Sequence, residues 1–161
     1  MTMQAHNTIV IGVGNPFRSD DGAGRLVVKC LRSQIPRGVK VLEETGDGAE
    51  LLEAWKGADS VFLVDAVQSG APPGTIHRLD ARVEKLPTWF SHSSTHSFGV
   101  AEAIELARTM GELPDKLVVY GIEGLDFSAG TELSPDVAEV LPAAANLILQ
   151  EILHLPATRS A

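Results

Sequence analysis

The stretch IVIGVGNPFRSDDGAGR, from Ile9 to Arg25, decides the fold of this chain because it joins an apolar strand to a glycine turn and a helix. Its start is similar to a dinucleotide-binding loop, but that loop needs a third glycine at position 17, where Phe17 stands. Two adjacent carboxylates, Asp20 and Asp21, would also repel a phosphate where such loops offer bare amides. The charge of this turn therefore favours a cationic partner, such as a metal ion, over a nucleotide.

The composition is typical of one globular domain. The chain has 161 residues, 44% of them apolar, so we expect a single domain over residues 1–161 with its own core. The net charge of -8 argues against nucleic acid as a partner, since its binders need a basic surface. The segment 1–7 lacks the basic start of a signal peptide, and no run approaches the roughly 20 apolar residues of a membrane span. We expect a cytoplasmic protein without membrane insertion.

Strand and helix patterns alternate along the chain, which predicts a mainly parallel sheet covered on both faces. The expected strands cover residues 8–13, 39–43, 60–67, 75–79 and 116–122. The strand at 60–67 is the most apolar and is expected at the centre, whereas the alternation at 75–79 predicts an antiparallel edge strand. Helices are expected over 23–31 and 49–55, from residue 96 onward, and after residue 134.

Several single residues carry their own expectations. The only cysteine, Cys30, falls at a helical spacing that predicts a small core residue, and it suits a reducing compartment. Ser134 has the position of a helix cap, and Pro142 is expected to divide the helical region that follows. Trp89 and Phe90 could contact a partner or pack against the core, and we expect that they pack against the core.

Polar side chains follow the expected strands at the point where ligands of parallel sheets bind. Asp20 and Asp21 follow the first strand, Asp65 ends the strand at 60–67, and His96 lies where a loop enters a helix, with His92 as a competitor. A helix cap is the simpler explanation for Asp20, whereas Asp65 interrupts an apolar run in which an unpaired carboxylate is costly. Together, two carboxylates and an imidazole suit a divalent transition metal with open positions for water or substrate.

Four motifs, in this order, resemble the hydrogenase maturation endopeptidases, which trim the large subunit of nickel–iron hydrogenases: GVGNPFRSDDGAG, VDAV, SSTHSFG, and YGIEG followed by LSPDV. The resemblance implies a three-layer α/β/α sandwich with a twisted, mostly parallel sheet of about five strands. It also implies that Asp21, Asp65 and His96 are the catalytic and metal-binding positions, the first being often glutamate in relatives. After the second strand, ETGDG replaces the more usual Asp-Gly-Gly-Thr, which leaves the role of Asp47 open.

The function implied by the resemblance is that of an endopeptidase for the precursor of a [NiFe] hydrogenase large subunit. It removes a C-terminal extension once nickel has been loaded, and that nickel is the feature recognised. The nickel is supplied by the substrate, and another divalent metal can take the site in the isolated protein. Two roles stay open: the metal activates water, bringing its pKa to about 7, or Asp21 or Asp65 acts as a general base, as in an aspartic-type enzyme.

Two other classes of protein remain possible from the residues. A nickel metallochaperone would use the same three ligands without cleaving anything, and a nucleotide-binding α/β protein would reuse the glycine turn. A serine enzyme is not indicated, because the serines near residue 96 are not part of a nucleophile elbow, and there is no HExxH zinc signature.

Overall fold

The computed structural model describes residues 3–91, 95–156 and 158–160, and its centre is a five-stranded sheet. The strands follow the order β3-β2-β4-β6-β5, and neighbours are parallel except β5 with β6. Their bounds are β2 Thr8–Val13, β3 Lys40–Glu44, β4 Ser60–Val67, β5 Ile76–Asp80 and β6 Lys116–Glu123. The predicted fold class is confirmed, as are the central place of β4 and the antiparallel edge strand β5.

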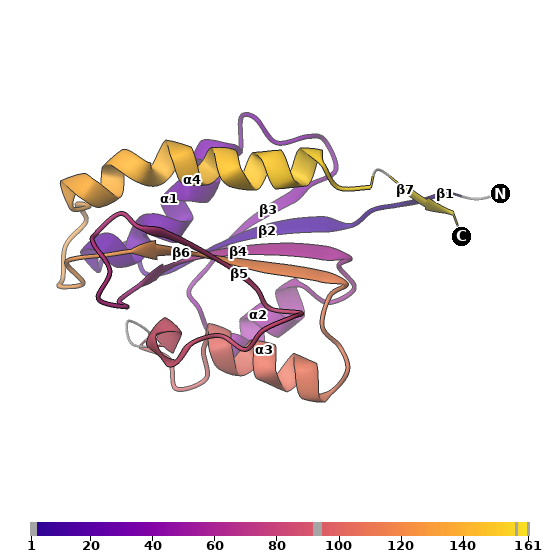
Figure 1. Ribbon diagram of the computed structural model, residues 1–161, viewed down its shortest axis with the longest axis horizontal. Coiled ribbons are helices and arrows are strands. Elements are labelled where there is room, and N and C mark those ends of the chain that lie inside the picture. The colour runs from indigo at the N-terminus through magenta and orange to yellow at the C-terminus, as the bar shows by residue number, and fades with distance from the viewer. Residues whose placement is uncertain (1–2, 92–94, 157, 161) are drawn as a thin grey trace.

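Helices cover both faces of the sheet, with α1 and α4 on one face and α2 and α3 on the other (Figure 1). Their bounds are α1 Ala23–Leu31, α2 Gly48–Ala54, α3 Val100–Thr109 and α4 Pro135–Leu153. The remaining elements are the short 3-10 helices η1 Ser19–Gly22 and η2 Thr88–Ser91, and the antiparallel pair β1 Met3–Ala5 and β7 Thr158–Ser160. None of the helices in the described part of the chain is long and apolar enough to cross a membrane.

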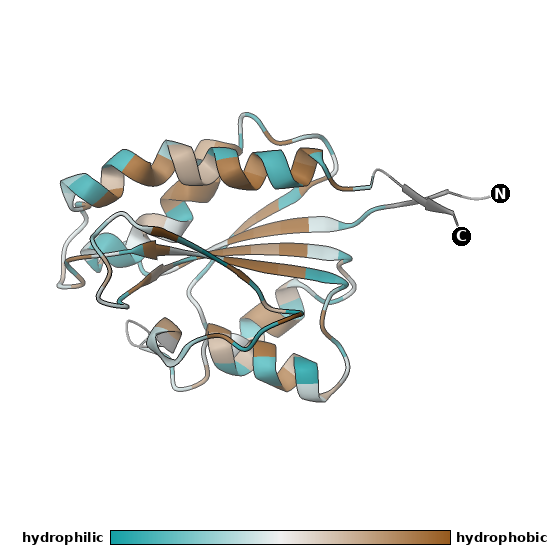
Figure 2. Ribbon diagram, viewed as in Figure 1, coloured by the Kyte–Doolittle hydropathy of each residue, from teal (hydrophilic) through white to brown (hydrophobic). Residues whose placement is uncertain are grey.

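Strands β2 and β4, in the interior of the sheet, are buried along their whole length, which explains their mostly apolar sequence. Successive side chains point to opposite faces, so Val10 and Phe62 belong to the core under α1 and α4, and Ile11 and Leu63 to the core under α2 and α3. Figure 2 shows the strands of the sheet largely in the brown of hydrophobic residues. Burial of one such side chain contributes about 1.5–3 kcal/mol to folding stability. The two cores therefore stabilise the sheet, and the site lies at its carboxyl edge.

Helix α1 packs directly on the sheet at Gly24, where an added Cβ would lie 2.2 Å from the carbonyl oxygen of Val64. This close approach turns Gly24, Val28 and Leu31 inward, and all three are buried. Cys30 is consequently exposed, so the prediction of a core cysteine is wrong. The helical spacing was right, but the rotation of the helix is set by the glycine contact.

Helix α4 runs without a break through Pro142, so the prediction that this proline divides the helix is wrong. The missing amide leaves the carbonyl of Ala138 without its helical partner. Both residues are exposed, so water can satisfy that carbonyl, while Leu141 and Ala145 on the inner face stay buried. Packing of the inner face therefore outweighs the loss of one hydrogen bond.

The segment before α3 differs from the prediction because the helix begins at Val100, four residues after His96. Gly99 is the N-cap residue, and the Glu102 side chain accepts a hydrogen bond from its amide at 2.9 Å. Phe90 in η2 is 2% exposed, which confirms its predicted place in the core. The competing His92, with Ser93 and Ser94, lies outside the described residues.

Candidate active site

The turn after β2 brings Asp21 to the carboxyl edge of the sheet. Gly14 has φ +145°, and a Cβ on it would lie 1.9 Å from the carbonyl oxygen of Asp21, so only glycine lets the two segments meet. The Asp21 carboxylate accepts a hydrogen bond from the Asn15 amide at 2.9 Å and lies 3.6 Å from the Arg18 guanidinium. The glycine turn and the Asn15 amide thus hold Asp21 in one orientation.

Asp65 lies near the end of the central strand β4 and is 8% exposed. Its Oδ1 accepts a hydrogen bond from the Ala66 amide at 2.8 Å. Burial, and then the negative charge of Asp21, raise the pKa of Asp65 well above its usual range, against the smaller effect of the Ala66 amide. Burial also raises the pKa of Asp21, although the Asn15 amide and the charges of Arg18 and His96 oppose it. Such paired shifts are typical of functional carboxylates.

His96 is half-buried in the loop that leads to α3. The loop between β3 and α2 passes beside it: a Cβ on Gly46 would lie 3.6 Å from Cδ2 of His96 and 3.1 Å from Cγ1 of Val13. Gly46 also has φ +103°, a conformation that favours glycine. The β3–α2 loop therefore leaves room for the imidazole to approach the end of β2. The charge of His96 acts to lower the pKa of Asp21.

The structure brings the three residues predicted from the sequence around one cavity. Asp21, Asp65 and His96 line a space of about 20 Å³ at the carboxyl edge, room for a single water or ion. The other lining residues are Val13, Gly14, Thr45, Gly46, Phe90, Thr95, Val100, Ala101 and Glu102. Across the described ranges, no group of three His, Cys, Asp or Glu side chains could hold a metal ion as they lie. Metal binding by the three residues therefore stays a prediction.

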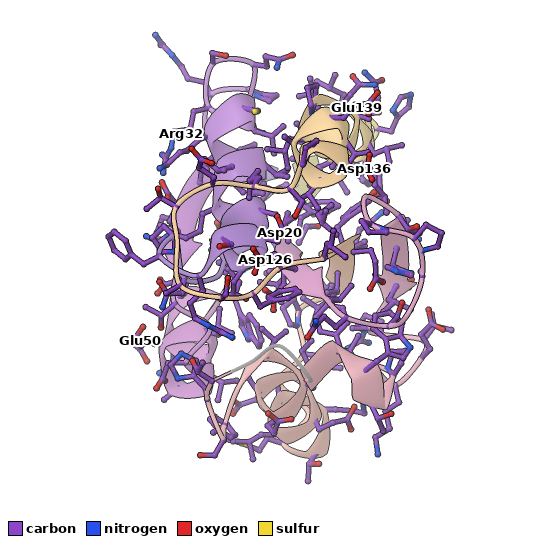
Figure 3. All side chains as sticks on the ribbon, turned by 90° about the vertical axis from the view of Figure 1, so that its left-hand side faces the viewer. Asp20, Arg32, Glu50, Asp126, Asp136 and Glu139 are labelled. Carbon is purple, nitrogen blue, oxygen red and sulfur yellow. The ribbon has the colours of Figure 1, made fainter. Side chains whose placement is uncertain are left out.

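Asp20 has a structural role different from the one expected. Its carboxylate is fully buried and accepts hydrogen bonds from the amides of Leu125, Asp126 and Ser134 at 2.7–2.9 Å, and from the Ser134 hydroxyl at 2.7 Å. Burial raises the pKa of Asp20, but these bonds outweigh it and hold the pKa below its usual value. Asp20 thus connects the turn after β2 to the segment before α4. Figure 3 shows Asp20 and Asp126 close to each other.

Asp47, whose role the sequence left open, caps helix α2. Its Oδ1 accepts hydrogen bonds from the amides of Ala49 at 2.9 Å and Glu50 at 3.1 Å. A side-chain oxygen in this position satisfies amides at the helix start that have no helical partner. Asp47 therefore has a structural role as the N-cap residue of α2.

A further buried carboxylate, Glu123 at the end of β6, was missed from the sequence. It is 2% exposed and accepts hydrogen bonds from the Ser69 amide at 2.8 Å and from Nε2 of His77 at 3.0 Å. His77 packs on Trp89 with ring centroids 4.9 Å apart. The signal was present in YGIEG, where an acid ends an apolar strand as Asp65 does. Ser69 and Glu123 meet the same nitrogen of His77, so the group lacks the arrangement of a catalytic triad.

Comparison with known proteins identifies the family. Residues 25–151 match the family HycI, hydrogenase maturation protease. The hydrogenase 2 maturation protease of Escherichia coli K12 is 30% identical over 145 residues, which cover 88% of this chain and 87% of that protein. The hydrogenase expression/formation protein HupD of Thiocapsa roseopersicina is 28% identical over 147 residues, 88% of this chain and 66% of that longer protein.

The fold agrees with that of a solved relative. The structure of the hydrogenase maturating endopeptidase HybD from Escherichia coli matches with a TM-score of 0.77 and 26% identity, and the match covers 91% of this chain and 92% of that one. Sequence and structure therefore give the same answer over nearly the whole chain. The chain belongs to the hydrogenase maturation protease family.

Proposed function

We propose that this chain is an endopeptidase that removes the C-terminal extension of a nickel-loaded precursor of a [NiFe] hydrogenase large subunit. The observation that carries the proposal is the meeting of Asp21, Asp65 and His96, from three separate segments, around one cavity in a member of this family. The nickel belongs to the substrate and arrives with it. The partner is that precursor, and the cytoplasm is the proposed location.

The electrostatics of the cavity favour a cationic group on the substrate. Burial raises the pKa of both Asp21 and Asp65, and the negative charge of Asp21 raises the pKa of Asp65 further. A divalent ion placed between them removes that repulsion, and carboxylate and imidazole groups are suitable ligands for it. The nickel of a loaded precursor would therefore position the tail at the cavity that the three side chains line.

The chemistry required is hydrolysis of one peptide bond. A water molecule in the cavity attacks the scissile carbonyl carbon, the carbon–nitrogen bond breaks, and one proton passes from water to the leaving amine. We assign the role of base to Asp65, since a carboxylate with a raised pKa accepts a proton more readily near neutral pH. Bound nickel supplies a Lewis acid that polarises the carbonyl and acidifies water. Asp21 and His96 then hold the nickel-bearing substrate.

The decisive experiment is a processing assay. The purified protein is incubated with nickel-loaded and nickel-free precursor, and the mass of the large subunit is measured. We expect loss of the C-terminal tail in the loaded precursor alone. Asp65→Ala and His96→Ala should abolish cleavage while circular dichroism shows a folded protein, and Glu112→Ala, exposed and outside the cavity, is the matched control.

Each other outcome has a clear meaning. An intact tail in both precursors, with nickel transferred to or from the protein, would replace the protease by a metallochaperone. Equal cleavage of both precursors would remove nickel as the recognition feature. Full activity of both alanine variants would remove Asp65 and His96 from the site.

A further inference from the structure

Positive charge is concentrated in one segment of an otherwise acidic chain. Residues 22–42 contain five of the 13 basic residues and no aspartate or glutamate, whereas all 21 acidic residues lie elsewhere. The five are spread over 16 positions and alternate with apolar residues, so they form no basic block in the sequence. Most of this segment is helix α1 and the connection that follows it.

Three of these cations share a single carboxylate. Arg25, Lys29 and Arg32 lie along one side of α1 and reach Glu43 of β3 at 3.3, 3.8 and 3.2 Å. Burial raises the pKa of Glu43, but the bonds from Arg32 and Arg25 and the charge of Lys29 outweigh it and lower the pKa, so Glu43 stays ionised. Arg25 also faces Glu44, so two carboxylates stand against three cations, and Lys29 and Arg32 leave the outer side of this face cationic. The Lys29 and Arg32 side chains are about half exposed, and Figure 3 shows Arg32 at the outer side of α1.

An apolar groove adjoins this cationic face. A cavity of about 210 Å³ has Phe17, Leu26 and Leu133 among its lining residues, together with Arg25 and Lys29. Phe17 is 69% exposed, which is unusual for a phenyl ring without a partner. The groove also includes residues 19 and 22 of η1, the same short turn that carries the candidate catalytic aspartate.

The two loops that border the groove are fastened to each other. The Gly130 amide donates to the Phe17 carbonyl at 2.9 Å, and the Ser19 amide donates to the Gly130 carbonyl at 2.9 Å. The Ser19 hydroxyl donates to the carbonyl of Ser128 at 2.8 Å. The groove is therefore formed before any partner arrives, which lowers the entropy lost on binding.

We propose that this groove and the cationic face of α1 dock an acidic segment of the precursor that also carries an apolar side chain. The apolar side chain would pack against Phe17 and Leu26, and the carboxylates would face Lys29 and Arg32. Residues 19 and 22 of η1 line the groove and Asp21 between them lines the cavity, so a precursor docked in the groove would lie next to the cavity. The inference rests on the proposed function for the identity of the partner. Opposite charges at the exposed edge of an interface mainly raise the association rate and the specificity of binding.

The test is a binding measurement separate from cleavage. The equilibrium dissociation constant of nickel-free precursor is measured for the wild type and for the double variant Lys29→Glu/Arg32→Glu. We expect about tenfold weaker binding in the variant and a weaker dependence on salt. The control is Arg82→Glu/Lys85→Glu, which makes the same charge change at two exposed residues outside the groove. Phe17→Ala should also weaken binding, without the change in salt dependence.

The outcomes separate docking from catalysis. Equal affinity of the wild type and the Lys29/Arg32 variant, or no binding by the wild type, would overturn the docking surface. Equal weakening by the control variant would overturn it as well, because it would reflect net charge alone. Binding as expected without cleavage of nickel-loaded precursor would remove the proposed function and leave the docking surface standing. With loaded precursor, the variant should show a KM raised about tenfold with kcat unchanged.

Discussion

Asp20 and Asp21 are adjacent in the chain, yet their carboxylates lie in opposite environments. Asp20 accepts four hydrogen bonds from residues 125, 126 and 134, and its pKa is lowered despite its burial. Asp21 lines the cavity with one backbone hydrogen bond, and burial raises its pKa. One carboxylate fastens the loops of the carboxyl edge, and the other is available for chemistry.

Replacing Asp20 by asparagine should destabilise the protein by about 2–3 kcal/mol at pH 7, because a side-chain amide group would face backbone donors. The pKa of Asp20 is lower in the folded than in the unfolded chain, so its stabilisation is present above the unfolded pKa of about 3.9. It is lost as the pH falls through the folded value. Urea unfolding at pH 7 and pH 3 should therefore show that the difference in free energy of unfolding between wild type and variant is smaller at pH 3. A difference of equal size at both pH values would contradict this.

Asp65→Asn should have the opposite effect on stability. The folded pKa of Asp65 is raised, so the wild type loses stability as the pH rises from the unfolded pKa through the folded one. Asparagine does not ionise and can still accept the Ala66 hydrogen bond. Thermal unfolding should show the variant more stable by at least about 1 kcal/mol at pH 8, with the difference vanishing near pH 4. A variant less stable than wild type at pH 8 would show that the folded protein compensates the negative charge of the Asp65 carboxylate.

Asp21 offers a test by conservative replacement. Glutamate keeps the carboxylate and is only one methylene longer, so Asp21→Glu should retain processing. Asp21→Ala should lower the processing rate by about 100-fold or more, the size expected when a proton-transferring or substrate-orienting group is lost. Both rates are measured by the mass of the precursor, at equal protein stability. Equal activity of the two variants would remove Asp21 from the site.

Gly24→Ala should destabilise the protein by about 3 kcal/mol, because the new Cβ would lie 2.2 Å from the carbonyl oxygen of Val64 and force α1 off the sheet. Gly57→Ala is a suitable control, since Gly57 has φ +78° but open space around it, so only backbone strain of about 1 kcal/mol is expected. Chemical unfolding measures both. A similar loss in the two variants would show that helix α1 can shift without cost.

Pro142→Ala should stabilise the protein by about 1–2 kcal/mol. The substitution restores the hydrogen bond to Ala138 within α4 and removes the clash of the proline ring, at an exposed position without packing to lose. The gain is smaller than the full cost of proline in a helix, because alanine also raises the conformational entropy of the unfolded chain. Thermal unfolding checks it, with Ala143→Gly as a destabilising reference on the same helix. A lower melting temperature would show that the proline fits its site.

The sequence alone determined the layers and order of elements, because local periodicity reports which side of a strand or helix is buried. It also predicted that Asp21, Asp65 and His96 would meet, since the carboxyl ends of parallel strands converge at one edge.

Tertiary structure decided what depends on contacts between distant segments. The partners of Asp20 lie 105–114 residues away, and those of Glu123 lie 46 and 54 residues away, so no local pattern could show them. The exposure of Cys30 follows from the close packing of α1 on β4, which sets the rotation of the helix. Periodicity fixes the spacing of a buried face, whereas its direction is set by the surface against which the element packs.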